Sequence, residues 1–158
     1  MSADSAVREM LARSLSWKDA HAGFDASVKD LPADLRGKRP AGLPHSPWEI
    51  LEHLRIAQHD ILDFCINPDY HEMEWPKDYW PPSPEPPSKA AWDESVAAFV
   101  RDREAVQKLA TDTSLDLTAR IPWGTGQTYL REIVLILDHN TYHTGQLVLI
   151  RRLLGSWT

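Results

Sequence analysis

The chain has 158 residues, of which 42% are hydrophobic, and its 17 basic and 23 acidic residues give a formal net charge of −6. This length and composition predict one globular domain spanning residues 1–158. The acidic balance and the absence of a basic stripe exclude nucleic acid as an expected partner, and no apolar run approaches the roughly 20 residues that cross a membrane. The N-terminus lacks a secretory pattern, which favours a cytoplasmic location. Cys65 is the only cysteine and is interpreted as a core residue, so no intrachain disulfide is expected.

The first predicted helix runs from Ser5 to about Leu31. Its apolar residues recur at intervals of three and four, which is the spacing of one helical face. Proline and glycine residues between Pro32 and His45 then break the helix. The inward stripe predicted from this spacing consists of Val7, Met10, Leu11, Ser14, Trp17, His21, Phe24, Val28 and Leu31.

The second predicted helix has a strong start signal. Ser46 is a candidate N-cap, Pro47 suits the first helical position, and Glu49 completes a capping box. The helix runs to about Asn67, where the following proline stops it. Its apolar stripe places His53 on the inward face.

The segment from Pro68 to Pro87, called the strap below, contains seven prolines and no glycine, interleaved with tyrosine and tryptophan. Proline stiffens the backbone and aromatic side chains need a surface to cover, so we expect an ordered strap packed on the bundle. Its length permits a long crossover between the second and third helices, which therefore need not be antiparallel neighbours.

The third predicted helix follows Ser88 as its N-cap and ends near Thr111, and the fourth runs from about Thr128 to Leu154. The predicted fold class is therefore all-α, a four-helix bundle. Gly145 lies inside the fourth helix, where glycine costs up to about 1 kcal/mol relative to alanine. We expect a close helix–helix approach at this position.

The fourth helix also carries two histidines, His139 and His143, at a spacing that places both on one otherwise apolar face. An unpaired buried imidazole costs roughly 1–3 kcal/mol, and a shared metal ion would remove that cost because neutral imidazole binds zinc, nickel and iron. Surface histidines and ordinary core histidines also show this spacing. The inward position of His53 favours a three-histidine metal site, and three protein ligands leave coordination positions open, as in catalytic centres.

The two histidine segments resemble those of the DinB/YfiT superfamily of four-helix-bundle metalloproteins. The matching stretches are Trp48 to Leu54, with the pattern Trp-x-x-x-x-His-Leu, and His139 to Gln146, with the pattern His-x-x-x-His-x-Gly-Gln. The resemblance implies an up-down-down-up helix order. It also implies one divalent metal ion held by His53, His139 and His143, usually Ni²⁺ or Zn²⁺, with Fe²⁺ and Mn²⁺ as alternatives.

Three functions follow from such a centre. Relatives in the family include thiol-dependent transferases and isomerases, so the resemblance implies a small-molecule substrate together with a low-molecular-weight thiol. A metal-dependent hydrolase is the alternative enzyme, because a bound metal also lowers the pKa of water. A non-catalytic metal-containing binding or stress-response module is the competing class. The oligomeric state is open, since Trp80 and Trp157 suit either a homodimer contact or internal packing.

No catalytic residue is assigned from the sequence, but four side chains are candidates for the pocket. His21 is either a hydrogen-bonded core histidine or a pocket residue. Glu49 has its capping role but lies one turn before His53. Glu132 precedes His139 by two turns on the same face. Gln146 is expected either to pack between the helices or to hydrogen-bond a ligand histidine.

Overall fold

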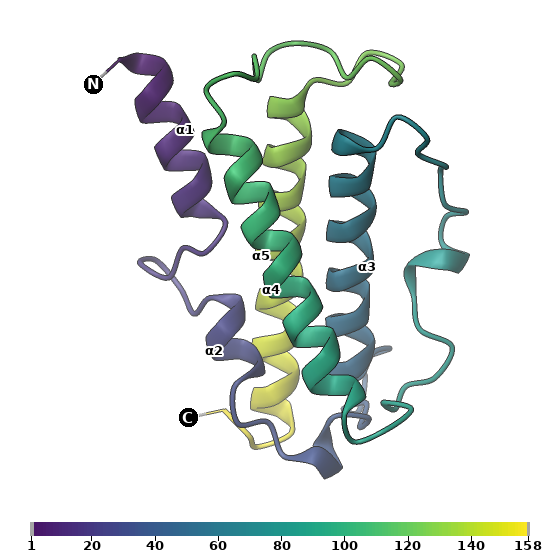
Figure 1. Ribbon diagram of the computed structural model, residues 1–158. Coiled ribbons are helices and arrows are strands. Elements are labelled where there is room, and N and C mark those ends of the chain that lie inside the picture. Colours follow the sequence, from purple (N-terminus) through teal and green to yellow (C-terminus); the bar gives the residue numbers. More distant parts are fainter. Residues whose placement is uncertain (1, 158) are drawn as a thin grey trace.

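The computed structural model describes residues 2–157, which form a helical bundle with no β-strand in that range (Figure 1). The predicted all-α class is therefore confirmed. No helix in the described residues is both long enough and apolar enough to cross a membrane. The elements are α1 (Ala3–Ser14), α2 (Phe24–Val28), the 3₁₀ turn η1 (Ala33–Leu35), α3 (Pro47–Ile66), the 3₁₀ turn η2 (Lys77–Tyr79), α4 (Ala91–Thr111) and α5 (Tyr129–Leu153).

The first predicted helix is two helices, α1 and α2, separated by a loop over residues 15–23. The loop folds tightly at its end, where a Cβ on Gly23 would lie 3.1 Å from the carbonyl oxygen of Trp17. Gly23 is the N-cap of α2, so the chain starts a new helix there instead of continuing the old one. The helical spacing of apolar residues in the sequence therefore continues across a break between two helices.

The predicted inward face of the first helix is wrong at Val7 and Met10, which are 50% and 49% exposed. Arg8 is buried in their place. Its guanidinium donates to the carbonyl oxygens of Asp112 and Leu115, both at 2.7 Å, just beyond the end of α4. These bonds tie α1 to the segment that follows α4, and they fix which face of α1 meets the bundle.

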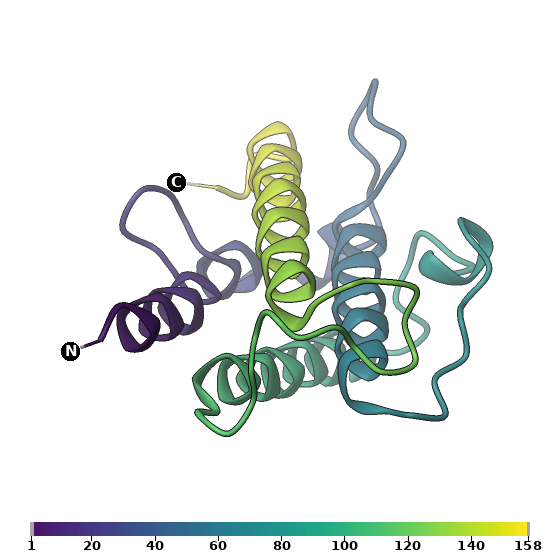
Figure 2. The same ribbon diagram turned by 90° about the horizontal axis from the view of Figure 1, so that it is seen from above.

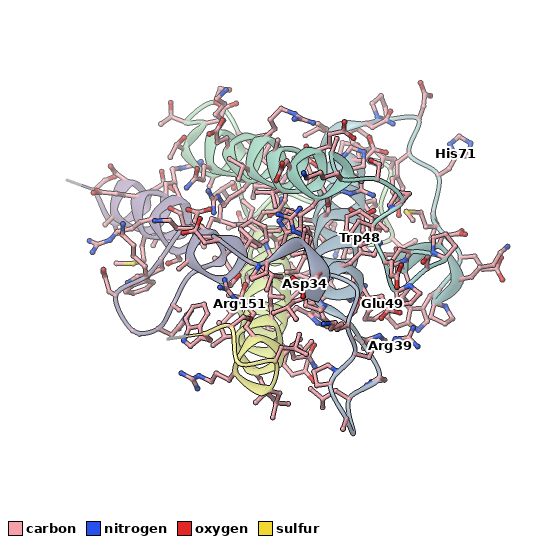
Figure 3. All side chains as sticks on the ribbon, turned by 90° about the horizontal axis from the view of Figure 1, so that it is seen from below. Asp34, Arg39, Trp48, Glu49, His71 and Arg151 are labelled. Carbon is pink, nitrogen blue, oxygen red and sulfur yellow. The ribbon has the colours of Figure 1, made fainter. Side chains whose placement is uncertain are left out.

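α3 starts as predicted. The Ser46 hydroxyl accepts from the Glu49 N–H at 3.2 Å, and the Glu49 carboxylate accepts from the Ser46 N–H at 2.8 Å, which completes the capping box. The same carboxylate accepts from the Arg39 guanidinium at 2.8 Å (Figure 3). These bonds occupy Glu49 at the base of the helix and account for its burial.

α4 and α5 differ from prediction in two details. α4 begins at Ala91, with Ala90 rather than Ser88 as its N-cap, although the Ser88 hydroxyl accepts from the Ala91 N–H at 3.1 Å. The prediction of a close helix–helix approach at Gly145 is wrong, because this residue is exposed and a Cβ at its position would meet nothing within 4 Å. The apolar residues that pack α5 lie on its other face, so the glycine faces open space.

The core forms where α3 packs against both α4 and α5. Fully buried residues from the three helices include Leu54, Phe99 and Ile136, at 0–1% exposed. Cys65 belongs to this core as predicted, and burial raises the pKa of its thiol to about 12. The C-terminal end of α5 is tied to α2 by Arg151, which donates to the carbonyl oxygens of Ser27 and Lys29 (Figure 3).

The strap is docked on the bundle through hydrogen bonds, as predicted. It lies along the outer side of α3 (Figures 1 and 2). The hydroxyls of Tyr70 and Tyr79 donate to the two carboxylate oxygens of Asp60 at 2.9 and 2.6 Å, and the Ser46 hydroxyl donates to the carbonyl of Pro84 at 2.6 Å. Trp80 packs internally, stacked on His53 at 4.0 Å between ring centroids. Bonds at both ends of the strap therefore hold it against one helix.

Candidate metal centre

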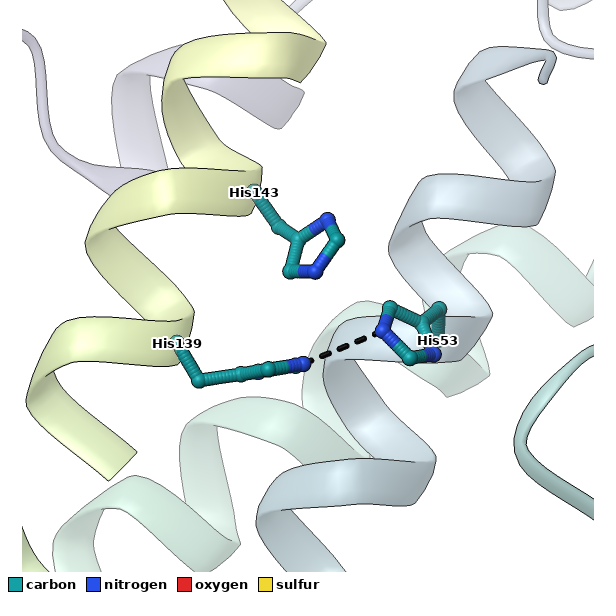
Figure 4. A group of neighbouring side chains, drawn as sticks. All are labelled: His53, His139 and His143. Atoms are coloured by element: carbon teal, nitrogen blue, oxygen red, sulfur yellow. Dashed lines mark hydrogen bonds between the residues drawn. The ribbon is translucent and has the colours of Figure 1, made fainter. Parts of the chain in front are cut away.

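Three histidines meet between α3 and α5. His53 projects from α3, and His139 and His143 project from successive turns of α5 toward it (Figure 4). The ring centroids are 4.8 Å apart for His53 and His139, 4.5 Å for His53 and His143, and 4.5 Å for His139 and His143. One nitrogen from each ring lies within 4.8 Å of the other two. The structure thus brings together the residues that the sequence analysis singled out.

Two of these rings are held by their Nδ1 atoms. His53 Nδ1 lies 2.9 Å from the carbonyl oxygen of Tyr79, and His143 Nδ1 lies 2.8 Å from Oε1 of Gln146. A carbonyl oxygen can only accept, so each Nδ1 carries the proton and each Nε2 presents a lone pair. This is the tautomer that a ligand coordinating through Nε2 requires, with an oxygen partner behind it.

Burial keeps the cluster neutral. Burial lowers the pKa of His139 to about 4, and the neighbouring His53 lowers it further. The side chain of Asn140 partly offsets this by raising the pKa. Burial likewise lowers the pKa of His143 to about 4, with His139 and His53 as further causes. The pKa of His53 is also lowered, mainly by burial. At neutral pH the three rings are therefore uncharged and able to donate lone pairs.

The arrangement of donors fits a divalent ion. The Nε2 atoms of His53 and His139 lie only 3.0 Å apart. Two nitrogens bound at about 2.0–2.1 Å to a common tetrahedral zinc ion would be roughly 3.3–3.4 Å apart, so little movement is needed to share one. Among the described residues, His139 Nδ1 is buried without a hydrogen-bond partner, and its Nε2 faces the Nε2 of His53. Neutral nitrogen donors suit zinc, nickel, iron or copper.

The histidines open onto a cavity of about 600 Å³ between α3, the strap, the loop over residues 123–127 and α5. Its walls include the aromatic rings of Trp75, Tyr79 and Trp123. The guanidinium of Arg131 lines it too and donates to the buried carboxylate of Glu132 at 2.6 Å. The cavity therefore combines aromatic walls with one arginine, three histidines and the three acidic residues Asp60, Glu72 and Glu132.

Of the four predicted pocket candidates, one lines the histidine cavity, one bonds a cluster histidine from outside it, and two lie elsewhere. Glu132 lines the cavity with the histidines, and Gln146 makes its expected bond to His143. His21 does not take its predicted inward place on a helix, because it lies in the loop between α1 and α2, is exposed, and borders a different cavity. Glu49 lies outside the histidine cavity and is held by Ser46 and Arg39.

Two strap residues that were not among the predicted site residues contact the centre. Tyr79 supplies the carbonyl that orients His53, and Trp80 lies parallel to the His53 ring, with an angle of 1° between the planes. The aromatic composition of the strap signalled docking, but a backbone carbonyl carries no residue-type signal. Only the path of the strap shows which carbonyl meets the histidine.

Comparison with known proteins gives one result at the level of the family. A profile of the DinB superfamily matches residues 16–147, a range that includes all three histidines of the cluster. No curated protein and no solved structure matched the chain. The profile match covers most of the chain, and the three-histidine cluster within it suggests a divalent metal. The chain therefore belongs to the DinB superfamily.

Proposed function

We propose that this chain is a divalent-metal-dependent enzyme, in which His53, His139 and His143 hold the ion and a low-molecular-weight thiol takes part in a transfer or isomerisation. The observation that supports this best is that the histidine cluster opens onto a cavity of about 600 Å³. Structural metal sites are closed by four protein ligands, whereas catalytic sites keep a position for substrate. An open three-histidine cluster at a cavity wall matches the second kind.

When bound, a divalent ion supplies Lewis acidity, which lowers the pKa of a thiol or of water. The all-nitrogen donor set supports Zn²⁺ or Ni²⁺ as the ion. The chain's own residues orient the histidine rings and shield one of them. The Tyr79 carbonyl and the Gln146 amide oxygen hold two of the rings, and Trp80 covers one face of His53.

The remaining cavity residues suggest how a small molecule is held. The side chain of Arg131 lines the cavity and is largely exposed. Its guanidinium is proposed to bind a carboxylate or phosphate group of the substrate. Trp75 and Trp123 supply flat apolar surface for the rest of the molecule. Glu132, which is 2% exposed, is proposed to take the proton that a thiol or substrate releases.

The proposal includes the helix order that the resemblance implies. We infer an up-down-down-up bundle in which α1 and α2 together serve as the first helix. In support, α3 and α4 run in the same direction in Figure 1, and the strap returns along α3 between them. This order leaves the strap beside the histidine cluster.

Elemental analysis followed by activity assays tests the function. The purified protein should contain close to one equivalent of zinc or nickel, and should convert an electrophile only when a low-molecular-weight thiol is added. His143→Ala should abolish both metal and turnover, while His59→Ala, which removes an exposed histidine of α3 outside the cluster, should preserve both. Ester or amide hydrolysis without thiol would favour the hydrolase instead. Bound metal without turnover in either assay would favour the non-catalytic module.

A further inference from the structure

One histidine of the cluster has no evident hydrogen-bond acceptor. His53 and His143 each direct Nδ1 at an oxygen, but His139 Nδ1 is buried and has no partner in the described part of the chain. Within residues 2–157, Oδ1 of the adjacent residue Asn140 is likewise buried without a hydrogen-bond partner. A buried polar atom without a hydrogen-bond partner destabilises the folded state, so two such atoms on adjacent residues point to an interaction between them.

The orientation of the Asn140 amide is fixed by a chain of hydrogen bonds from another helix. Gln58 is 0% exposed, and its Nε2 donates to the backbone carbonyl of Phe99 at 2.8 Å. A carbonyl cannot donate, so the amide of Gln58 has one possible orientation. Its Oε1 then accepts from Asn140 Nδ2 at 2.9 Å, which leaves Asn140 Oδ1 as an acceptor only.

We propose that Asn140 is a positioning residue of the metal centre, whose Oδ1 accepts the Nδ1–H of His139 and so fixes the tautomer with a lone pair on Nε2. The chain of hydrogen bonds then runs from the Phe99 carbonyl through Gln58 and Asn140 to His139. Every histidine of the cluster thereby has an oxygen behind its Nδ1 atom. For its effect on metal affinity this inference rests on the proposed function, but the tautomer is a property of the chain alone.

The tautomer of His139 decides how the Nε2 atoms of His53 and His139 interact. His53 Nε2 carries a lone pair because its Nδ1 bonds the Tyr79 carbonyl, and it lies 3.0 Å from His139 Nε2. In the other tautomer His139 would donate from Nε2 to His53 and close the cluster with an internal hydrogen bond. With the proton held at Nδ1 by Asn140, that internal hydrogen bond cannot form, and the Nε2 lone pairs of both rings stay available to a cation.

The test combines the tautomer of the metal-free protein with its zinc affinity. Long-range ¹H–¹⁵N NMR of histidine-labelled protein at neutral pH reports which nitrogen of His139 is protonated. Competition with a chromophoric chelator measures binding of Zn²⁺ alone. We expect wild-type His139 to be protonated at Nδ1. Asn140→Leu should lose this preference and bind Zn²⁺ about 10–100-fold more weakly, as expected when a ligand loses its outer hydrogen bond.

Two further variants separate positioning from folding. Asn140→Asp keeps an acceptor beside His139 but loses the donor to Gln58, so it should retain the Nδ1–H tautomer and bind Zn²⁺ more tightly than Asn140→Leu, despite a lower Tm. Gln107→Leu removes a comparable amide, one that donates to the carbonyl of Ala12 away from the centre, and should change neither the tautomer nor the affinity.

An Nε2–H tautomer of His139 in the wild-type protein would overturn the proposal, and this measurement needs no variant to fold. Unchanged Zn²⁺ affinity in a folded Asn140→Leu protein would overturn it as well. An Nδ1–H tautomer in a wild-type protein that binds no zinc or nickel would support the positioning role and refute the proposed function instead.

Discussion

At the scale of single residues, the candidate centre depends on which nitrogen of each histidine carries the proton. The Tyr79 carbonyl and the Gln146 side chain assign the proton to Nδ1 in His53 and His143. The Nε2 atoms that remain converge between α3 and α5 (Figure 4). The ligands and their hydrogen-bond partners therefore form one functional unit, and substitutions in either should affect metal binding.

Removing any cluster histidine should release the metal. His53→Ala, His139→Ala and His143→Ala should each lose most bound metal while far-ultraviolet circular dichroism stays helical, because two ligands hold a divalent ion far less tightly than three. Elemental analysis after gel filtration measures the loss, with His59→Ala as the control. A double variant at His139 and His143 that kept a full equivalent of metal would show that the site is wrongly assigned.

Removing the partner of His143 should weaken the centre without abolishing it. Gln146→Leu deletes the 2.8 Å bond to Nδ1 and frees the ring to rotate or change tautomer. We expect Zn²⁺ affinity to fall by about 10–100-fold, the usual effect of losing such a partner. Chelator competition measures it, and Gln107→Leu serves as the matched amide control. Equal affinities for both variants would contradict the role of Gln146.

At the scale of elements, the strap and α3 form a pair joined by Asp60. Both carboxylate oxygens of this buried residue accept tyrosine hydroxyls from the strap. Tyr79 then serves twice, since its hydroxyl bonds Asp60 and its carbonyl orients His53. Docking of the strap is thereby coupled to the geometry of the candidate metal centre.

Two tyrosine variants should separate docking from ligand orientation. Tyr70→Phe and Tyr79→Phe each remove one hydrogen bond to Asp60, so each should lower the free energy of unfolding by about 1–3 kcal/mol. Only Tyr79→Phe loosens the carbonyl that holds His53, so only this variant should also weaken Zn²⁺ binding and speed amide exchange around η2. Denaturant unfolding, chelator competition and hydrogen exchange make the comparison. Identical effects of the two variants on zinc would argue against the coupling.

At the scale of the whole molecule, the buried neutral histidines make stability depend on pH. In the unfolded chain histidine titrates near pH 6.5, whereas burial lowers the pKa of His139 and His143 to about 4 in the folded protein. Between these values the unfolded state binds more protons than the folded state. The free energy of unfolding therefore falls as the pH decreases through this window, and these groups have no effect above it.

A double variant tests the pH dependence directly. In metal-free protein, we expect the Tm to fall steadily from about pH 6.5 to about pH 4, with a shallower fall for His139→Gln combined with His143→Gln. Other groups, including the carboxylates whose pKa values are lowered, titrate in both proteins, so the difference between the two curves isolates the histidines. Parallel curves would mean that the two rings are not buried as neutral groups.

Saturating metal should raise stability because the ion binds the folded cluster and not the dispersed histidines of the unfolded chain. At a free metal concentration about 100 times the Kd, the expected gain is about 2.7 kcal/mol. Differential scanning calorimetry of the protein with and without Zn²⁺ measures it, and His143→Ala should show little gain. An equal gain in that variant would place the binding elsewhere.

Local signals in the sequence determined much of this protein. The capping box of Ser46 and Glu49 starts α3, Thr128 caps α5, and helical periodicity turns His53, His139 and His143 inward, because each of these features depends on residues within a turn or two of each other. The proline and aromatic content of the strap indicated docking for a similar reason. Such a composition favours a stiff chain that covers apolar surface.

The tertiary structure decided what depends on distant partners. Arg8 turns α1 by binding carbonyls more than a hundred residues away, so Val7 and Met10 are exposed although their spacing indicated burial. Gly145 faces open space although it lies inside a helix. Spacing along a helix shows that residues share a face, but only packing shows which face meets a neighbour. The carbonyl of Tyr79 reaches His53, and the amide of Gln58 reaches Asn140, through packing alone, because a hydrogen bond between elements depends on their relative positions.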